Sequence, residues 1–310
     1  MAVIETGELT KRYGDVEALV DLDVTVSSGV TGLVGANGAG KSTLIKILLG
    51  LLAPSSGTAT VLGHDIVTGG SRIRAVVGYM PEHECLPPDV RAIDFVVHMG
   101  RMSGLPPASA RERAADVLRH VGLAEERYRL MGGYSTGMKQ RAKLAQALVH
   151  DPKLVLLDEP TNGLDPEARD EMIALVSRIG RDFGIPVLVT SHLLGELERV
   201  SDHVIVLDAG RLLSSQATTE LTRVTGVLLV EVLGSAEEQR RMGEALAAAG
   251  VPCRPRQQMI EIDARGMPHE RAPYDLIRDT ACELGLGLVR IQAEHGRIQD
   301  VFEPGAVAHG

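Results

Sequence analysis

The octapeptide from Gly35 to Ser42 constrains the fold more than any other stretch of this 310-residue chain. It reads GANGAGKS and fits the pattern G-x-x-x-x-G-K-[ST] at every fixed position. The apolar run 30–34 before it predicts a short strand, and the segment 42–49 after it predicts a helix. A glycine-rich turn in this setting turns backbone N–H groups toward a phosphate, and the dipole of the following helix favours an anion there. The motif therefore predicts an α/β nucleotide-binding fold.

The residue types of this loop indicate its chemistry. Lys41 is expected to act as a point charge on the β- and γ-phosphates of ATP, with the Ser42 hydroxyl as a ligand of Mg²⁺. The residues expected to bind the nucleotide here are Gly35, Ala36, Asn37, Gly38, Ala39, Gly40, Lys41, Ser42 and Thr43. The alternative interpretation is a glycine-rich turn between a strand and a helix that binds no ligand.

A second candidate element is the apolar run from Leu154 to Leu157, which ends in Asp158 and Glu159. A run that is apolar on both faces suits a central parallel strand, whose carboxyl end lies where ligands bind. Asp158 is expected to hold Mg²⁺, and Glu159 to polarise the attacking water. A helix cap is the other interpretation, since acidic residues before a proline often start a helix.

Between these two motifs lies the segment from Tyr134 to Gln140, YSTGMKQ, and with it the chain resembles the ATP-binding subunit of an ABC transporter over about residues 1–215. The segment stands where the family carries its L-S-G-G-Q signature, with Ser135 and Gly137 at the most characteristic positions. Thr136 and Met138 depart from that signature in a way that is similar to exporter-type subunits of the ABC-2 group. The plain alternative is a well-capped helix start, because Ser135 can cap a following helix.

The resemblance implies a head-to-tail dimer of ATPase subunits, as a homodimer or a heterodimer, with two ATP molecules between the subunits. Ser135 and Gly137 of one subunit would then meet a γ-phosphate held by the other. Leu164-Asp165 resembles the D-loop, which communicates across such a dimer, although a turn with a helix N-cap explains the same residues.

Two further positions take their roles from the family. His192, after the apolar strand 186–189, matches the switch histidine that contacts the γ-phosphate and helps to position water. Tyr13 stands where the family places an aromatic ring on the adenine face, a contact that tunes affinity more than chemistry. A histidine in an ordinary loop and a tyrosine in an ordinary hairpin are the alternatives.

Glu82 departs from the family pattern, because it replaces the usual glutamine of the Q-loop. A carboxylate keeps the oxygen that can approach Mg²⁺ or water, and it adds negative charge beside the phosphates. We expect Glu82 to report bound Mg-ATP to a transmembrane partner, with a stronger dependence on the metal than a glutamine has. An exposed loop carboxylate without such a role is the alternative.

The nucleotide motifs occupy an expected ATP-binding domain over residues 1–217, with N-terminal antiparallel strands, a mainly parallel core sheet and a helical insertion at about 86–140. Residues 218–310 are expected to form a small α+β accessory domain. Its predicted strands are 227–232, 259–262 and 286–291, and its predicted helices are 236–249 and 274–283. The ending 298–302, IQDVF, is similar to the tail found after exporter-type ATPase domains.

Composition narrows the choice of partners and compartment. The formal charge of −9 and the aromatic content of 3% without tryptophan oppose nucleic-acid binding. Three distant cysteines, in no C-x-x-C pair, suit a reducing cytoplasm and predict no zinc site. Neither a secretory signal nor a run of about 18 or more apolar residues is visible, so any pore must be a separate transmembrane permease. The chain is therefore expected to be cytoplasmic and peripheral on the inner face of the membrane.

The leading hypothesis is an ATPase subunit that drives export through that permease. The main alternative is a soluble ABC-type ATPase that acts on ribosomes or DNA; such relatives usually carry two ATPase domains or a long coiled-coil insertion, and this chain shows neither. An ATP-binding regulator without turnover is a third class, which the full set Lys41, Asp158, Glu159 and His192 opposes. The transported substrate cannot be read from the residues.

Overall fold

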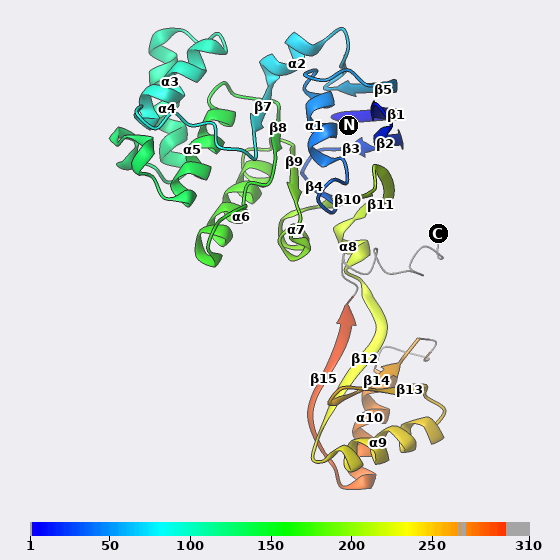
Figure 1. Ribbon diagram of the computed structural model, residues 1–310. Helices are drawn as coiled ribbons and strands as arrows, with labels where there is room; N and C mark the ends of the chain where they lie inside the picture. The colour runs from blue at the N-terminus through cyan, green and yellow to red at the C-terminus, as the bar shows by residue number, and fades with distance from the viewer. Residues whose placement is uncertain (1, 266, 268–270, 296–310) are drawn as a thin grey trace. The chain divides into compact units, whose positions relative to one another are not determined.

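The computed structural model describes residues 2–265, 267 and 271–295, and the chain divides into two compact units, one up to Thr218 and one from Thr219 (Figure 1). The tail-like segment 298–302 lies outside the described residues.

The first unit is built on a six-stranded sheet in the order β11-β10-β4-β9-β8-β7. The strands are β4 (Val30–Val34), β7 (Val77–Met80), β8 (Leu154–Leu157), β9 (Val187–Ser191), β10 (His203–Asp208) and β11 (Arg211–Ala217). All pairings are parallel except that of the edge strand β11. Every residue of β4, β8 and β9 is buried, which explains their apolar runs and confirms the predicted central strands.

An antiparallel sheet precedes and flanks this core, as predicted. It contains β1 (Ile4–Tyr13), β2 (Val16–Leu22), β3 (Thr25–Val26), β5 (Ser56–Val61) and β6 (His64–Asp65), in the order β2-β1-β5-β6 with β3 paired to β1. Helix α1 (Lys41–Leu48) packs into the same core cluster, where Leu9 of β1, Ile45 of α1 and Leu156 of β8 are all buried. The loop before α1 is therefore held between the two sheets.

Helices form the insertion between β7 and β8 (Figure 1). They are α3 (Ala92–Met102), α4 (Pro107–His120) and α5 (Thr136–Leu148), with two short 3₁₀ turns at Glu126–Tyr128 and Met131–Gly133. The predicted break is present at 103–106, although Pro107 is the first residue of α4, where its missing N–H costs nothing. Helices α2 (Gly70–Val76), α6 (Pro166–Arg181) and α7 (Leu194–Val200) complete the unit, and no helix in the described part of the chain is long and apolar enough to span a membrane.

The second unit is a four-stranded sheet in the order β13-β14-β12-β15, with two helices packed on it. Its elements are α8 (Thr218–Leu221), at the junction, β12 (Val224–Leu233), α9 (Ala236–Ala248), β13 (Cys253–Arg256), β14 (Met259–Asp263), α10 (Ala272–Leu284) and β15 (Gly287–His295). The predicted strands and helices are present. Strand β13 was not predicted, because it contains Pro255, and it lies at a sheet edge where a missing N–H is tolerated.

Candidate nucleotide-binding site

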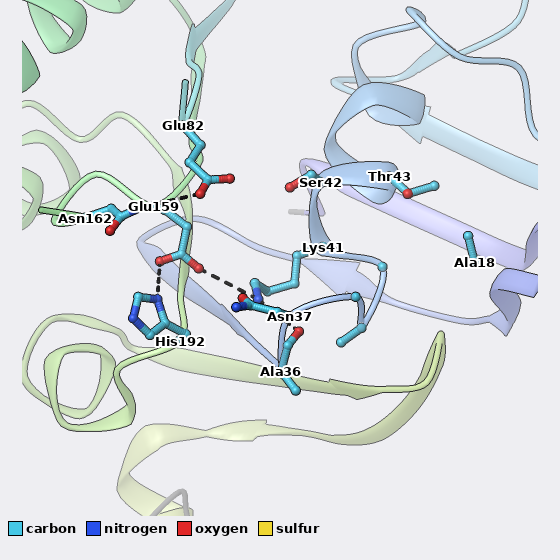
Figure 2. Close-up of a pocket in the computed structure, with 13 residues that line it drawn as sticks. Ala18, Ala36, Asn37, Lys41, Ser42, Thr43, Glu82, Glu159, Asn162 and His192 are labelled. Atoms are coloured by element: carbon cyan, nitrogen blue, oxygen red, sulfur yellow. Dashed lines mark hydrogen bonds and ion pairs between the residues drawn. The ribbon is translucent and has the colours of Figure 1, made fainter. Parts of the chain in front are cut away.

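A cavity of about 440 Å³ opens at the carboxyl ends of β4, β8 and β9 (Figure 2). Parallel strands bring their following loops to one edge, so segments far apart in the sequence meet there. The residues that line the cavity are Ala18, Ala36, Asn37, Gly38, Ala39, Gly40, Lys41, Ser42, Thr43, Glu82, Glu159, Asn162 and His192. Among these, only Ala18 and Asn162 lie outside the set expected from the sequence.

The loop before α1 is curled around the ammonium of Lys41. Lys41 Nζ donates to the carbonyl oxygens of Gly35 at 2.6 Å and Ala36 at 3.3 Å, and the side chain is 7% exposed. Gly40 has φ +101°, and a Cβ there would lie 2.6 Å from the carbonyl oxygen of Ala18. The loop therefore requires glycine at this position, and Ala18 explains part of that requirement.

Glu159 links Lys41 to His192 (Figure 2). One carboxylate oxygen, Oε1, lies 3.7 Å from Lys41 Nζ, and the other, Oε2, lies 2.8 Å from His192 Nδ1. Because an ionised carboxylate can only accept, the contact requires the proton on Nδ1 of His192. Glu159 is 5% exposed, and a carboxylate buried to this degree needs such partners.

Thr190, near the end of β9, holds two neighbouring acidic residues, Asp158 by its side chain and Glu159 by its backbone. Its Oγ1 donates to Asp158 Oδ1 at 2.9 Å and accepts from the Glu159 amide N–H at 2.8 Å. Glu159 itself has φ +49°, a left-handed backbone conformation that residues other than glycine rarely adopt. Thr190 was not among the residues expected at the site, and a hydroxyl near the end of a buried strand was the one signal of its role.

Oxygen atoms that could bind a cation are present on the cavity wall and next to it. Ser42 Oγ donates to Asp158 Oδ1 at 3.4 Å, and the carboxylate of Glu82 also lines the cavity. No cluster of three or more histidine, cysteine or acidic side chains that could hold a metal occurs in the described part of the chain. Two or three oxygens suit Mg²⁺, which keeps several waters and is completed by substrate phosphates, so Ser42, Asp158 and Glu82 fit this ion.

The segment after β7 brings Glu82 to the cavity. Its Oε1 accepts from Asn162 Nδ2 at 3.4 Å, which connects the segment to the loop after β8. Behind it, burial raises the pKa of Tyr79 to about 12, with the negative charge of Asp158 acting in the same direction. Asn162 was not expected at the site from the sequence. Asp165, three residues later, caps α6 by accepting from the Ala168 amide at 2.9 Å.

Five expected residues do not line the cavity. Two of them contact residues that do: the Gly35 carbonyl accepts from Lys41 Nζ, and Asp158 Oδ1 accepts from Ser42 Oγ. The other three lie elsewhere. Tyr13 lies at the tip of the β1–β2 hairpin, opposite Val16, and is 49% exposed. Ser135 is the N-cap of α5, where its Oγ accepts from the Met138 amide at 3.3 Å, and Gly137 follows in the first turn of this helix. Ser135 is exposed and Gly137 is half-buried, so the start of α5 faces outward.

Comparisons with known proteins agree with this geometry. The family model described as ABC transporter matches residues 19–162. The daunorubicin/doxorubicin resistance ATP-binding protein DrrA of Streptomyces peucetius is 37% identical over 247 residues, which cover 79% of this chain and 74% of DrrA. Nod factor export ATP-binding protein I of Cupriavidus metallidurans is 36% identical over 246 residues, which cover 77% of this chain and 80% of that protein. A solved structure of cbiO1 from Clostridium perfringens, part of the ABC transporter complex cbiONQ, aligns with a TM-score of 0.65 and 28% identity over 71% of this chain and 90% of that chain.

Proposed function

The chain belongs to the ABC transporter family of ATP-binding proteins, and we propose that it hydrolyses Mg-ATP in the cavity around Lys41 to drive export through a separate membrane permease. The α/β fold of an ABC ATPase predicted from the sequence is confirmed. The name of DrrA contains the word resistance, and that of Nod factor export ATP-binding protein I contains the word export. These names support transport out of the cell. The observation that carries the proposal is the connected set of Lys41, Glu159 and His192 on one cavity wall.

The roles in ATP hydrolysis follow from these contacts. The phosphates would compete with Glu159 for the ammonium of Lys41, because they carry more charge than one carboxylate. Glu159 would then accept a hydrogen bond from the attacking water, while the Nδ1–H of His192 holds the carboxylate in place. Mg²⁺, held by Ser42, Asp158 and Glu82, would supply charge neutralisation on the phosphate oxygens. Tyr13 would stack on the adenine ring.

A second ATPase subunit would complete the site. Ser135 and Gly137 lie at the outward-facing start of α5, and neither lines the cavity of their own chain. Free N–H groups at the start of a helix bind anions, so the same residues of a partner subunit would meet the γ-phosphate. We propose a head-to-tail dimer on the inner face of the membrane, in which the helical insertion and the Glu82 segment meet the permease.

The substitution Glu159→Gln tests both the chemistry and the assembly. It keeps the size of the side chain and removes the base, so we expect kcat for ATP hydrolysis to fall by about 10² to 10⁴ while ATP binding persists. In size-exclusion chromatography with ATP, the variant should shift toward the dimer, because the bound nucleotide is not consumed.

Glu112→Gln is the matched control, since Glu112 is an exposed residue of α4 that does not line the cavity. It should hydrolyse ATP at the wild-type rate. Full activity of Glu159→Gln would exclude Glu159 as the base. A Glu159→Gln variant that binds ATP and stays monomeric at high concentration would exclude the two-subunit arrangement.

A further inference from the structure

The helix α5 carries a buried lysine that the nucleotide site does not use directly. Lys143 is 3% exposed and does not line the cavity. A charged ammonium is expensive to bury unless it is paired with a counter-charge, so such a lysine needs a reason to be there. No ion pair is formed by Lys143 among the described residues, and its direct partners are two backbone oxygens.

Those two oxygens belong to the segment that positions Glu82. Lys143 Nζ donates to the carbonyl oxygen of Glu82 at 2.9 Å and to that of His83 at 3.4 Å. A backbone contact of this kind fixes the path of the chain whatever the side chain at Glu82 is. It also places a full positive charge behind a residue whose carboxylate faces the cavity.

One face of α5 follows the whole segment. Lys139, Lys143 and Gln146 are spaced by four and three residues, so their side chains lie on the same side of the helix. Lys139 pairs with Glu84 at 3.0 Å, and Gln146 Oε1 lies 3.9 Å from the Cys85 thiol. Lys143 is the buried member in the middle, and its contacts are therefore the least weakened by solvent.

The same helix also reaches the loop after β8. Gln140 Nε2 donates to the Asn162 carbonyl oxygen at 3.1 Å, and Asn162 Nδ2 donates to Glu82 Oε1 at 3.4 Å. The side chain and the backbone of Glu82 are thus both held, directly or through Asn162, by the helix that begins at Ser135. Burial lowers the pKa of Lys143, and the negative charges of Glu84, Glu82 and Asp158 act in the opposite direction and favour the ammonium.

We infer that Lys143 is a positioning residue for ATP hydrolysis, which holds the Glu82 segment against α5 and balances the negative charge that Glu82 adds beside Asp158. The effect on kcat rests on the proposed function, whereas the contact between Lys143 and the Glu82 segment does not. A glutamine at position 82 would need the backbone contact and not the charge. Lys143 and Glu82 therefore act as a pair, and the start of α5 is mechanically connected to the cavity through them.

The first experiment measures the backbone contact without any activity. Hydrogen exchange by mass spectrometry compares the peptide that contains residues 82–85 in the wild type, Lys143→Met and Lys153→Met. Lys153 is exposed, so its variant controls for the loss of a lysine. We expect exchange in this peptide to be about tenfold faster in Lys143→Met only, because the two hydrogen bonds that hold its backbone against α5 are lost and the segment opens more often. Equal exchange in all three proteins would overturn the positioning role.

The second experiment separates the charge from packing. Lys143→Met should lower kcat for ATP hydrolysis by about tenfold or more and leave KM for ATP within about threefold, because Lys143 does not line the cavity. Adding Glu82→Gln to Lys143→Met should restore only the part of kcat that was lost with the charge, because the backbone contact is still missing. Adding it to Lys143→Gln, which keeps an N–H donor, should restore kcat to within about threefold of Glu82→Gln alone. Losses that simply multiply in the double variant, or a raised KM with unchanged kcat, would show a packing role and overturn the charge pairing.

Lys143→Gln allows both experiments to be carried out even if Lys143→Met does not fold. It keeps an N–H donor for the two carbonyl oxygens and removes the charge, so it should preserve slow exchange at 82–85 and still lose kcat in a way that Glu82→Gln rescues. An inactive wild type would refute the proposed ATPase function, whereas the exchange experiment would still decide the positioning role.

Discussion

Replacement of Thr190 by valine tests how the acidic pair is held. Valine has nearly the shape of threonine, so the change removes one hydroxyl and leaves packing intact. That hydroxyl is wholly buried, donates to Asp158 at 2.9 Å and accepts from the Glu159 amide at 2.8 Å. Valine removes a hydrogen bond to a charged carboxylate and leaves the buried Glu159 N–H without an acceptor. Together these losses should lower the free energy of unfolding by about 3 kcal/mol.

The same change should impair hydrolysis more than binding. Glu159 is held at φ +49° immediately before Pro160, a strained conformation that the Thr190 contact helps to maintain. Without that contact the backbone can relax and move the carboxylate, and a misplacement of about 1 Å can reduce kcat by about a hundredfold. The KM for ATP should change little, because Thr190 is not on the cavity wall.

Unfolding in urea measures the free energy of unfolding of Thr190→Val and of Thr190→Ser. Far-UV circular dichroism follows the transition, because the chain has no tryptophan. The serine variant keeps the hydroxyl and is the matched control, with a small loss expected for its missing methyl group. ATP hydrolysis is measured on the same preparations. A valine variant as stable as the serine variant, or one with wild-type kcat, would refute the role assigned to the hydroxyl.

Two further predictions concern neighbours of the same site. Glu82→Gln should weaken the dependence of ATP hydrolysis on Mg²⁺ concentration, because it removes a carboxylate from the cavity wall; an unchanged Mg²⁺ titration would contradict this role. Tyr79→Phe should change the alkaline stability. The pKa of Tyr79 is raised from 10.0 to about 12, so between these values the unfolded chain releases a proton that the folded chain keeps, and stability falls as pH rises above 10. Urea midpoints from pH 8 to 11 should fall more steeply for the wild type than for Tyr79→Phe, and parallel curves would argue against the shifted pKa.

Much of the site was predictable because its signals are local. The loop 35–42 needs glycines at set positions in one short turn, and the runs at 30–34 and 154–157 are apolar on both faces because parallel central strands are covered on both sides. The N-cap role of Ser135 could be predicted for the same reason, since a cap depends on residues within one helical turn.

Other features were invisible because they depend on distant segments. Strand β13 contains a proline, which indicates a loop until the neighbouring strands show that it lies at an edge. Ala18 enters the cavity wall from β2, and only the packing of the N-terminal sheet against the loop at Gly40 places it there.

The residues by themselves determined the nucleotide chemistry and the class of fold, since both follow from motifs written within a few consecutive positions. The tertiary structure decided which groups hold those motifs in place: Thr190 between Asp158 and Glu159, and Lys143 behind Glu82. The physical reason is that a buried hydroxyl or ammonium obtains its role from its partners, and these partners lie 31 to 61 residues away along the chain.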